Sequence, residues 1–422
     1  MKKLLFLVSI FVVSSILQAQ NYNDYFTSST LRIDYMHSGT ANTEDISFVR
    51  FVKDKIWAGN PNNLIDTFGY GKYIVKVYDE KTEKLIYSYG FCSLFEEWQT
   101  TEEAQKIKKA FEESLIIPYP KSNIRIELLS RQADNSFLKI HEFNFSTKTE
   151  VETIGKTNIK TKNYINNGDY KNRLDIAVVG DGYTEAETEN FYAEASKIID
   201  FLLNDPAIKP LKHLINVNFI QPISLESGVD FPSKNIWKNT ALDSRFDTFY
   251  SDRYLTTASY HKLRDAVSGT PCDQIIILVN TDNYGGGGIY NFYSITCSNH
   301  AYAPEVLVHE FGHAFAALGD EYYDSETSYI DFYNLKLEPY QPNLTTLVDF
   351  DSKWKNMMSK ETPIPTPVEI KYKNTVGVFE GGGYMAKGIF RPAINCKMKE
   401  LEAPFCKVCE NAIQKMIKFY AD

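Results

Sequence analysis

Apolar and polar residues alternate in short runs along the first third of the chain, a pattern that predicts β-strands. Four such runs stand out: residues 73–78, 84–89, 124–129 and 137–143. The polar residues 79–82 join the first two runs and predict a hairpin turn, and one helix-like stretch, residues 101–115, interrupts the series. We therefore expect residues 20–160 to form a β-sandwich accessory domain with a single helix and no cluster of catalytic residues.

The pattern changes after residues 148–172, a polar segment without clear periodicity that predicts a linker. Thr184 followed by Glu187 is a capping box, which predicts a helix that begins there and runs to about Leu203. A second helix is expected at residues 257–267. Three mostly apolar runs predict strands before, between and after these helices: residues 174–179, 217–223 and 274–279. The first has the pattern of a buried strand, and Pro222 in the second favours a bulge or a sheet edge.

A run of four glycines, residues 285–288, predicts a turn into another strand, residues 289–296. A long apolar helix follows from about Pro304 and ends at Gly319. The order of strands and helices over residues 170–422 predicts a mixed α/β sheet with helices packed on it. The last strand is a candidate sheet edge, along which an extended substrate peptide would add as an extra strand.

The composition is that of a folded globular protein and excludes long disorder, collagen and coiled coil. Of the 422 residues, 43% are hydrophobic and 23% are charged, and this length allows two or three domains. The chain has 54 acidic and 45 basic residues, which gives a formal net charge of −9. It lacks the basic surface expected of a nucleic-acid-binding protein, so we expect no nucleic-acid partner.

The first 19 residues have the features of a secretory signal peptide. Lys2 and Lys3 form a short basic start, residues 4–17 are mostly apolar, and Ala19 offers a small-residue cleavage site. A membrane-spanning helix would need about 20 apolar residues, and this run is shorter. Since no second such run follows, we expect a secreted or periplasmic protein without a membrane span after removal of residues 1–19.

Six cysteines in an exported chain favour disulfides, and three of them cluster near the C-terminus. Cys406 and Cys409 have the C-x-x-C spacing of a structural zinc site, but with Cys396 they supply only three thiols. A fourth ligand is missing from the pattern. We therefore expect a disulfide from Cys396 to Cys406 or Cys409, with a structural zinc site as the alternative.

The helix that begins near Pro304 contains the H-E-x-x-H pattern at residues 309–313. Because four residues make just over one helical turn, His309 and His313 project from the same face and can both reach one Zn²⁺ at about 2.0–2.1 Å. Glu310 lies beside that face, where it can take a proton from the attacking water and return it to the departing amine. Two unpaired imidazoles would be costly to bury in so apolar a helix, and a metal removes that cost.

A catalytic zinc ion usually has three protein ligands and one open position. Asp320 follows Gly319 at the end of the helix, and a left-handed glycine there would swing the Asp320 carboxylate back to the metal. Glu321 and Asp324 are competing ligands. We expect Asp320 to be the third ligand, and an ordinary solvated charge after a helix is the alternative.

Two residues further along the chain are candidates for supporting roles. Met398 is a candidate for the Met-turn that forms a hydrophobic floor beneath the metal in metzincins, although methionine also commonly fills gaps in a core. The metzincin pattern places the third ligand six residues after the second histidine, whereas Asp320 comes seven residues after His313. Tyr384, after three glycines, is a candidate donor to the oxyanion of the tetrahedral intermediate, and an ordinary surface or core tyrosine is the alternative.

These motifs resemble those of the bacterial IgA-specific metallopeptidase family. The similarity rests on six short segments: H-E-F-G-H at residues 309–313, G-D-E-Y at 319–322, G-D-G-Y-T at 180–184, E-S-G-V-D at 226–230, R-P at 391–392 leading to C-K-M at 396–398, and F-C-K-V-C at 405–409. It covers about residues 170–420, and the preceding β-rich region resembles the N-terminal domain found beside that catalytic domain. The resemblance implies His309, His313 and Asp320 as zinc ligands and Glu310 as the catalytic acid and base.

The interpretation that follows is a secreted zinc endopeptidase with a metzincin-like catalytic domain of α/β (α+β) architecture. It would hydrolyse peptide bonds of host or environmental proteins, and the resemblance implies immunoglobulin A as a substrate of some family members. Two alternatives remain: a retired protease scaffold that binds proteins or glycans, and a zinc enzyme acting on non-protein amides. The complete motif argues against the first. A protein or peptide substrate is the expected partner, and no oligomer is required.

Overall fold

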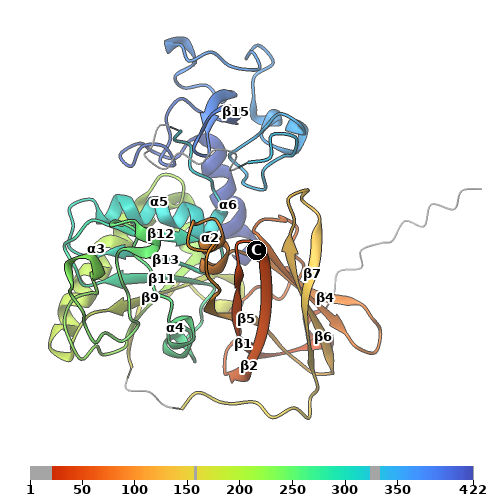
Figure 1. Ribbon diagram of the computed structural model, residues 1–422, viewed down its shortest axis with the longest axis vertical. Helices are drawn as coiled ribbons and strands as arrows, with labels where there is room; N and C mark the ends of the chain where they lie inside the picture. Colours follow the sequence, from red (N-terminus) through yellow and green to blue (C-terminus); the bar gives the residue numbers. More distant parts are fainter. Residues whose placement is uncertain (1–20, 156–158, 324–332, 422) are drawn as a thin grey trace, which may run out of the picture.

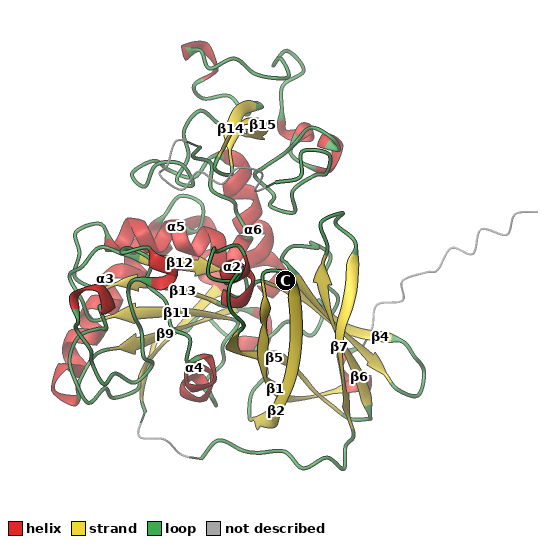
Figure 2. Ribbon diagram, viewed as in Figure 1, coloured by secondary structure: helices red, strands yellow, loops and turns green. Residues whose placement is uncertain are grey.

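The computed structural model describes residues 21–155, 159–323 and 333–421. It shows an N-terminal region built from antiparallel strands, followed by a region in which strands and helices alternate (Figure 1). Strands dominate the first region, and most of the helices lie in the second (Figure 2). This division confirms the all-β and mixed α/β architecture expected from the sequence.

The N-terminal region contains two antiparallel sheets. The first has the order β2-β1-β5, with β1 at Phe26–Thr40, β2 at Thr43–Asp54 and β5 at Lys109–Pro120. The second has the order β4-β3-β6-β7, with β3 at Tyr73–Asp79, β4 at Leu85–Phe91, β6 at Ile124–Arg131 and β7 at Phe137–Phe145. The second sheet consists of the four strands expected from the alternating runs. Fully buried side chains from both sheets, among them Ile33, Val75 and Ile126, form one shared core, as in a sandwich.

The helix expected at residues 101–115 is wrong. β5 occupies the second half of that stretch. The described helices of this region are α1 at Tyr22–Tyr25 and α2 at Leu94–Gln99. Leu115 of β5 pairs with Ile33 of β1, and both side chains are fully buried. Pairing and burial against β1 therefore override a local sequence that favours a helix.

The second region is built on a six-stranded sheet with the order β12-β13-β11-β9-β10-β8. Its strands are β8 at Lys160–Ile165, β9 at Leu174–Asp181, β10 at Ile215–Gln221, β11 at Gln274–Val279, β12 at Gly286–Ile289 and β13 at Tyr293–Cys297. The inner strands run parallel, and the edge strands β8 and β12 run antiparallel to their neighbours. Every residue of β9, β11 and β13 is buried, as expected for strands covered on both faces.

Helices cover this sheet on both faces (Figure 1). α3 at Thr188–Asn204, α5 at Ala303–Ala316 and α6 at Lys407–Ala421 lie on one face, and α4 at Tyr260–Val267 lies on the other, next to β5. A short hairpin, β14 at Phe379–Gly382 and β15 at Met385–Arg391, precedes α6. The predicted capping box before α3 is confirmed, because Thr184 and Glu187 bond each other as expected. No helix within the described ranges is long and apolar enough to cross a membrane.

Two segments of this region differ from their predicted structure. Part of the expected linker, residues 160–165, is strand β8, which pairs with β10. The glycine run is not a turn, because residues 286–289 form the edge strand β12. The chain turns instead near Asn291, whose φ is 51°. Glycine is required here because this strand packs closely against α5.

The edge-strand hypothesis for substrate binding at residues 289–296 is wrong for residues 293–296, which belong to β13, whereas Ile289 is the last residue of β12. β13 lies between β12 and β11, so both of its edges are paired. The edge strand is β12, and its outer side is bonded at Gly286, which accepts from the Leu255 N–H at 3.3 Å and donates to the Arg253 carbonyl at 3.3 Å. A peptide adding there would have to displace this segment, so we assign no substrate position to the sheet edge.

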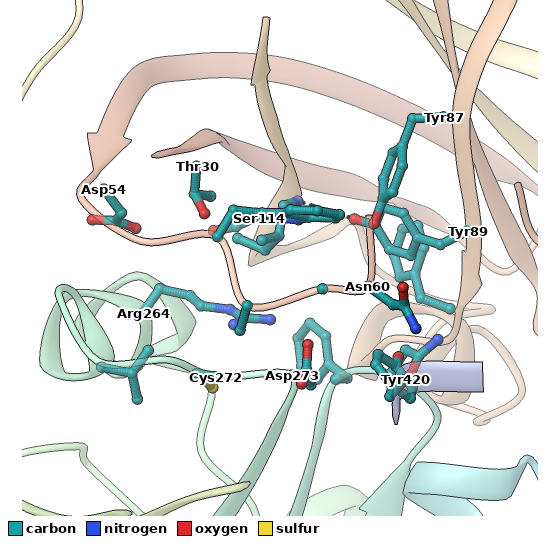
Figure 3. A pocket seen from close by; sticks show the side chains of 18 of the residues that line it. Thr30, Asp54, Asn60, Tyr87, Tyr89, Ser114, Arg264, Cys272, Asp273 and Tyr420 are labelled. Carbon is teal, nitrogen blue, oxygen red and sulfur yellow. Dashed lines mark hydrogen bonds between the residues drawn. The ribbon is translucent and has the colours of Figure 1, made fainter. Parts of the chain in front are cut away.

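The two regions pack against each other through α4. Asp265 of α4 pairs with Arg32 of β1 and Arg50 of β2, and the Arg32 side chain is fully buried. A cavity of about 120 Å³ lies at this interface, and residues of both regions line it, among them Tyr87, Arg264 and Asp273 (Figure 3). None of the described residues that line it belongs to α5, so it is separate from the H-E-x-x-H helix.

Candidate metal centre

The two histidines of the H-E-x-x-H pattern lie on α5 with their rings close together. α5 starts with Pro304 in its first turn and is buried along most of its length, as its apolar composition requires. His309 and His313 are one turn apart, and their Nε2 atoms are 3.1 Å from each other. Two imidazole nitrogens this close inside a protein can share a proton or a metal cation.

Asp320 completes a triangle of ligand atoms. Its Oδ1 lies 3.3 Å from Nε2 of His309 and 3.3 Å from Nε2 of His313. This oxygen is buried and has no hydrogen-bond partner among the described residues. Ligand atoms bonded at about 2.0–2.1 Å to a tetrahedral ion are about 3.3 Å apart. The three atoms therefore fit one face of such an ion.

Hydrogen bonds on the far side of each imidazole fix which nitrogen faces the site. Nδ1 of His309 lies 3.0 Å from the carbonyl oxygen of Lys397, and Nδ1 of His313 lies 2.6 Å from that of Leu318. Because a carbonyl oxygen only accepts, Nδ1–H is the donor in both rings, and Nε2 keeps a lone pair directed into the site. Metal-binding histidines are oriented in this way by their outer hydrogen bonds.

The three side chains also compete for protons. Burial disfavours the charged imidazole, but the Asp320 carboxylate outweighs burial, so that the pKa of His313 is raised to about 9 and that of His309 is also raised. Burial likewise opposes ionisation of Asp320, but the two histidines hold its pKa well below the usual range. The site therefore stabilises positive charge next to an ionised carboxylate, and a divalent cation would compete with protons for it.

Glu310 lies beside the histidine pair. One of its carboxylate oxygens is within 4.8 Å of the ligand nitrogens of both histidines. Burial raises the pKa of Glu310, and the neighbouring His309 and His313 offset part of that rise. A carboxyl group so placed is within reach of a reacting group at the metal and can exchange a proton with it.

The glycines of β12 allow this strand to pass directly over the backbone of Glu310. A Cβ on Gly288 would lie 2.2 Å from the Glu310 carbonyl oxygen, and one on Gly286 would lie 3.2 Å from Glu310 Cγ. Any larger residue would push the strand and the helix apart. The glycine run therefore fixes Glu310 between the sheet edge and the histidine pair, a role that the sequence pattern did not indicate.

The turn that brings Asp320 to the histidines differs from the prediction. The left-handed residue is Ala317, with φ of 51°, rather than Gly319. The N–H of Ala317 donates to the His313 carbonyl at 3.1 Å and closes the helix. Gly319 is required for a different reason, because a Cβ there would lie 2.6 Å from the side chain of Leu344.

Glu321, the first competing acid, points away from the histidines. Its carboxylate accepts from Asn343 Nδ2 at 3.0 Å and from the Cys409 thiol at 3.3 Å. Asp324 lies outside the described residues. Asn343 also bonds both backbone groups of Gly319 at 2.8 Å each and so holds the segment that carries the third carboxylate. A lone asparagine in a loop carries no sequence signal of this role.

Met398 lies against α5 between the two histidines. Its side chain is fully buried, and a Cβ on Gly312 would lie 2.9 Å from its Sδ. The Met398 carbonyl oxygen accepts from the Glu321 N–H at 2.8 Å. The turn that contains Met398 therefore contacts both the histidine helix and the segment after Gly319. The predicted hydrophobic floor would lie at this turn.

Tyr384 contacts the third carboxylate directly. Its hydroxyl donates to Oδ2 of Asp320, and its ring packs edge-on against Tyr322 with centroids 5.3 Å apart. By holding Oδ2, Tyr384 leaves Oδ1 facing the histidines. The role of Tyr384 as an oxyanion donor stays a prediction, since this contact does not test it.

Cys396, Cys406 and Cys409 gather next to the metal centre as free thiols. The Sγ atoms of Cys396 and Cys409 are 3.7 Å apart. The disulfide expected from the sequence stays a prediction. The structure adds a fourth group to this cluster, the carboxylate of Glu321.

The N-terminal region also contributes an acid near the site. Glu97 of α2 accepts a hydrogen bond from the Tyr254 hydroxyl. Burial raises the pKa of Glu97 to about 8, and the charges of His313 and Glu310 are close enough to affect it. No motif marks Glu97, because an acid in a short helix has the same appearance in the sequence as any surface residue. Only the contact between the two regions identifies it.

Comparison with known proteins gives two matches that together span most of the chain. The family described as IgA Peptidase M64 matches residues 163–372 and 368–417, and the one described as Peptidase M64 N-terminus matches residues 21–142. The first covers more than half of the chain and includes the histidine helix and Asp320. No curated protein matches the chain.

Proposed function

Because the chain belongs to the IgA Peptidase M64 family of metallopeptidases, we propose that it is a zinc-dependent endopeptidase of protein substrates. The observation that carries this proposal is the convergence of three ligand atoms, from His309, His313 and Asp320, at 3.1–3.3 Å from one another. Two imidazole nitrogens and a carboxylate oxygen suit Zn²⁺, and three protein ligands leave one position open for substrate.

A bound zinc ion would supply a Lewis acid that polarises the substrate carbonyl and lowers the pKa of the attacking water. Glu310 would take a proton from that water and deliver it to the departing amine. Tyr384 keeps the Asp320 carboxylate turned toward the histidines. The glycines of β12 allow this strand to pack directly against Glu310.

The protein would act outside the cytoplasm, on proteins of a host or of the environment. The signal-peptide features of residues 1–19 support the location. Immunoglobulin A is a candidate substrate on the strength of the family description. Incubation with a mixed pool of secreted proteins, followed by sequencing of the new N-termini, would identify the substrate and the cleavage site.

The decisive experiment compares the wild type with Glu310→Gln, which keeps the shape of the side chain and removes the base. We expect bound zinc to be retained, because Glu310 is not needed as a ligand, and kcat on casein or immunoglobulin A to fall by about 10²–10⁴-fold. His309→Ala should lose both zinc and cleavage. Glu369→Gln, at an exposed acid outside α5, is the matched control.

Two results would contradict the proposal. A wild type that binds zinc but releases no peptide from any protein in the pool would indicate a retired scaffold. Cleavage by Glu310→Gln at the wild-type rate would remove Glu310 from the mechanism.

A further inference from the structure

A second cluster of metal-binding groups lies next to the histidine site. Ligand atoms of Glu321, Cys396, Cys406 and Cys409 all lie within 4.8 Å of one another. Glu321, Cys396 and Cys409 are fully buried, and Cys406 is partly exposed. Burying thiols and a carboxylate together in a protein interior is energetically costly unless a compensating partner is present.

Three segments of the chain meet to form this cluster. Glu321 directly follows Asp320, Cys396 belongs to the turn that contains Met398, and Cys406 and Cys409 lie at the start of α6. The C-x-x-C spacing places the last two thiols on one side of the first helical turn. The backbone N–H of Cys406 donates to the Cys396 sulfur at 3.2 Å, a contact that stabilises a thiolate.

The distances within the cluster match a tetrahedral zinc site. Sulfur ligands bonded at about 2.3 Å to a tetrahedral ion are about 3.8 Å apart. The Sγ atoms of Cys396 and Cys409 are 3.7 Å apart, and Cys409 Sγ is 3.3 Å from Glu321 Oε1. The other carboxylate oxygen, Oε2 of Glu321, is buried without a hydrogen-bond partner among the described residues.

We propose that Glu321, Cys396, Cys406 and Cys409 together bind a structural zinc ion. Thiolate ligands select zinc over magnesium or calcium, and four protein ligands close the coordination shell, as in structural rather than catalytic sites. Glu321 is the fourth ligand that the sequence pattern alone did not supply. The partly exposed Cys406 provides the side from which the ion enters.

The position of this ion gives it a role beyond local stability. It would join the segment after Asp320 to α6 and to the turn whose Lys397 carbonyl orients His309. The binding of this ion does not depend on the proposed peptidase function. It would support that function by holding the third ligand of the histidine site in place.

A disulfide is the competing outcome. A bond between any two of the three thiols would leave the third thiol and the Glu321 carboxylate buried together without a cation. The number of free thiols therefore separates the two outcomes: all six cysteines titrate in the denatured, chelated zinc protein, whereas two are missing when a disulfide has formed.

The test uses the full chain, purified without chelator or reductant, as the wild type and as His309→Ala/His313→Ala. The double variant removes the histidine site, so any zinc that it retains belongs elsewhere. We expect two zinc ions per chain in the wild type and one in the double variant. Cobalt loaded into the double variant should show thiolate-to-metal charge-transfer absorption. Cys409→Ser added to it should lose that band, and Cys272→Ser, a thiol outside the cluster, should keep it.

The result that would overturn the proposal is a folded double variant without zinc and without a cobalt–thiolate band, whether its thiols are free or paired. This readout is independent of catalysis. A wild type that binds zinc at the cysteines but cleaves nothing would refute the proposed function and leave the second site intact.

Discussion

Gly288 lies where β12 crosses the backbone of α5, and its missing side chain can be tested directly. A Cβ at this position would lie 2.2 Å from the Glu310 carbonyl oxygen, and a backbone atom cannot rotate aside. We expect Gly288→Ala to lower the free energy of unfolding by about 1–3 kcal/mol and to reduce kcat by displacing Glu310. Denaturant unfolding and peptide cleavage measure the two effects.

The control for this change is Gly155→Ala, where no described atom lies within 4 Å of the added Cβ. It should leave both stability and activity close to the wild-type values. Equal unfolding curves for the two variants would show that β12 and α5 do not touch as described.

Tyr384 provides a second test at the scale of one residue. Its hydroxyl is the donor that holds Oδ2 of Asp320, and outer-shell partners of metal ligands typically contribute about 10–100-fold to metal affinity. We expect Tyr384→Phe to weaken zinc binding at the histidine site by that factor, measured by competition with a chelator. Tyr250→Phe, at an 83% exposed ring, is the control and should bind zinc normally. An unchanged affinity in Tyr384→Phe would mean that the hydroxyl does not orient Asp320.

At this scale, residue spacing predicts the part of the site that lies on one helix. The interval between His309 and His313 is enough to place both rings on one face. The groups that orient the ligands leave no such pattern in the sequence. Several of them are backbone carbonyls, and every residue type has one. The left-handed Ala317 also escaped prediction, since the sequence offers Gly319 nearby as the more favourable residue for that conformation.

Among the elements, the three-stranded sheet of the N-terminal region has a pH-sensitive connection. His37 of β1 lies 3.1 Å from Glu113 of β5 and 3.3 Å from Glu44 of β2. Burial opposes protonation of His37, but the two carboxylates outweigh it and raise its pKa from 6.5 to about 9. Because the folded-state pKa is the higher one, this stabilisation is complete below pH 6.5 and is lost as the pH rises through about 9.

We therefore expect the free energy of unfolding to decrease between pH 6.5 and about 9, by at most about 3 kcal/mol from this group. Chemical denaturation at several pH values measures the decrease. His37→Gln should remove it, and His213→Gln, at an exposed histidine, should retain it. A decrease of the same size in His37→Gln would assign the pH dependence to other groups.

Elements were predictable where the local apolar pattern matches the buried face. They were not predictable where a partner distant in the sequence determines the conformation. The alternating runs became β3, β4, β6 and β7 because one face of each is buried. The helix predicted at residues 101–115 is wrong because β5 pairs with β1, and the residues of that stretch alone do not indicate this pairing. The glycine run became a strand for the same reason, since its conformation is set by β13 and by the backbone of α5.

For the whole molecule, the ion pairs of Asp265 with Arg32 and Arg50 join the two regions, and we expect the regions to unfold as one unit. Asp265→Asn would leave the buried Arg32 with Asp34 as its remaining acidic partner. It would also remove the ion pair between Asp265 and Arg50. We expect a loss of about 1–3 kcal/mol of stability and a lower Tm, because a buried charge loses part of its compensation. Asp252→Asn, at an exposed acid, should change neither quantity.

Calorimetry can also show whether the regions depend on each other. A single transition that moves to lower temperature in Asp265→Asn is the expected result. Two separate transitions, with only the first affected, would show that the N-terminal region does not support the peptidase region.

Asp320 and Glu321 are neighbours in the chain, yet their carboxylates face opposite sides, one toward two imidazoles and the other toward three thiols. Deleting one residue between the second histidine and this pair would shift the register by one, so that Glu321 took the place of Asp320 beside the imidazoles and Tyr322 took the place of Glu321 beside the sulfurs. Both sites would then be wrong at once. The length of this connection is consequently as strict a requirement as the identity of any ligand, and natural variants of the protein should tolerate changes of residue there far more often than changes of length.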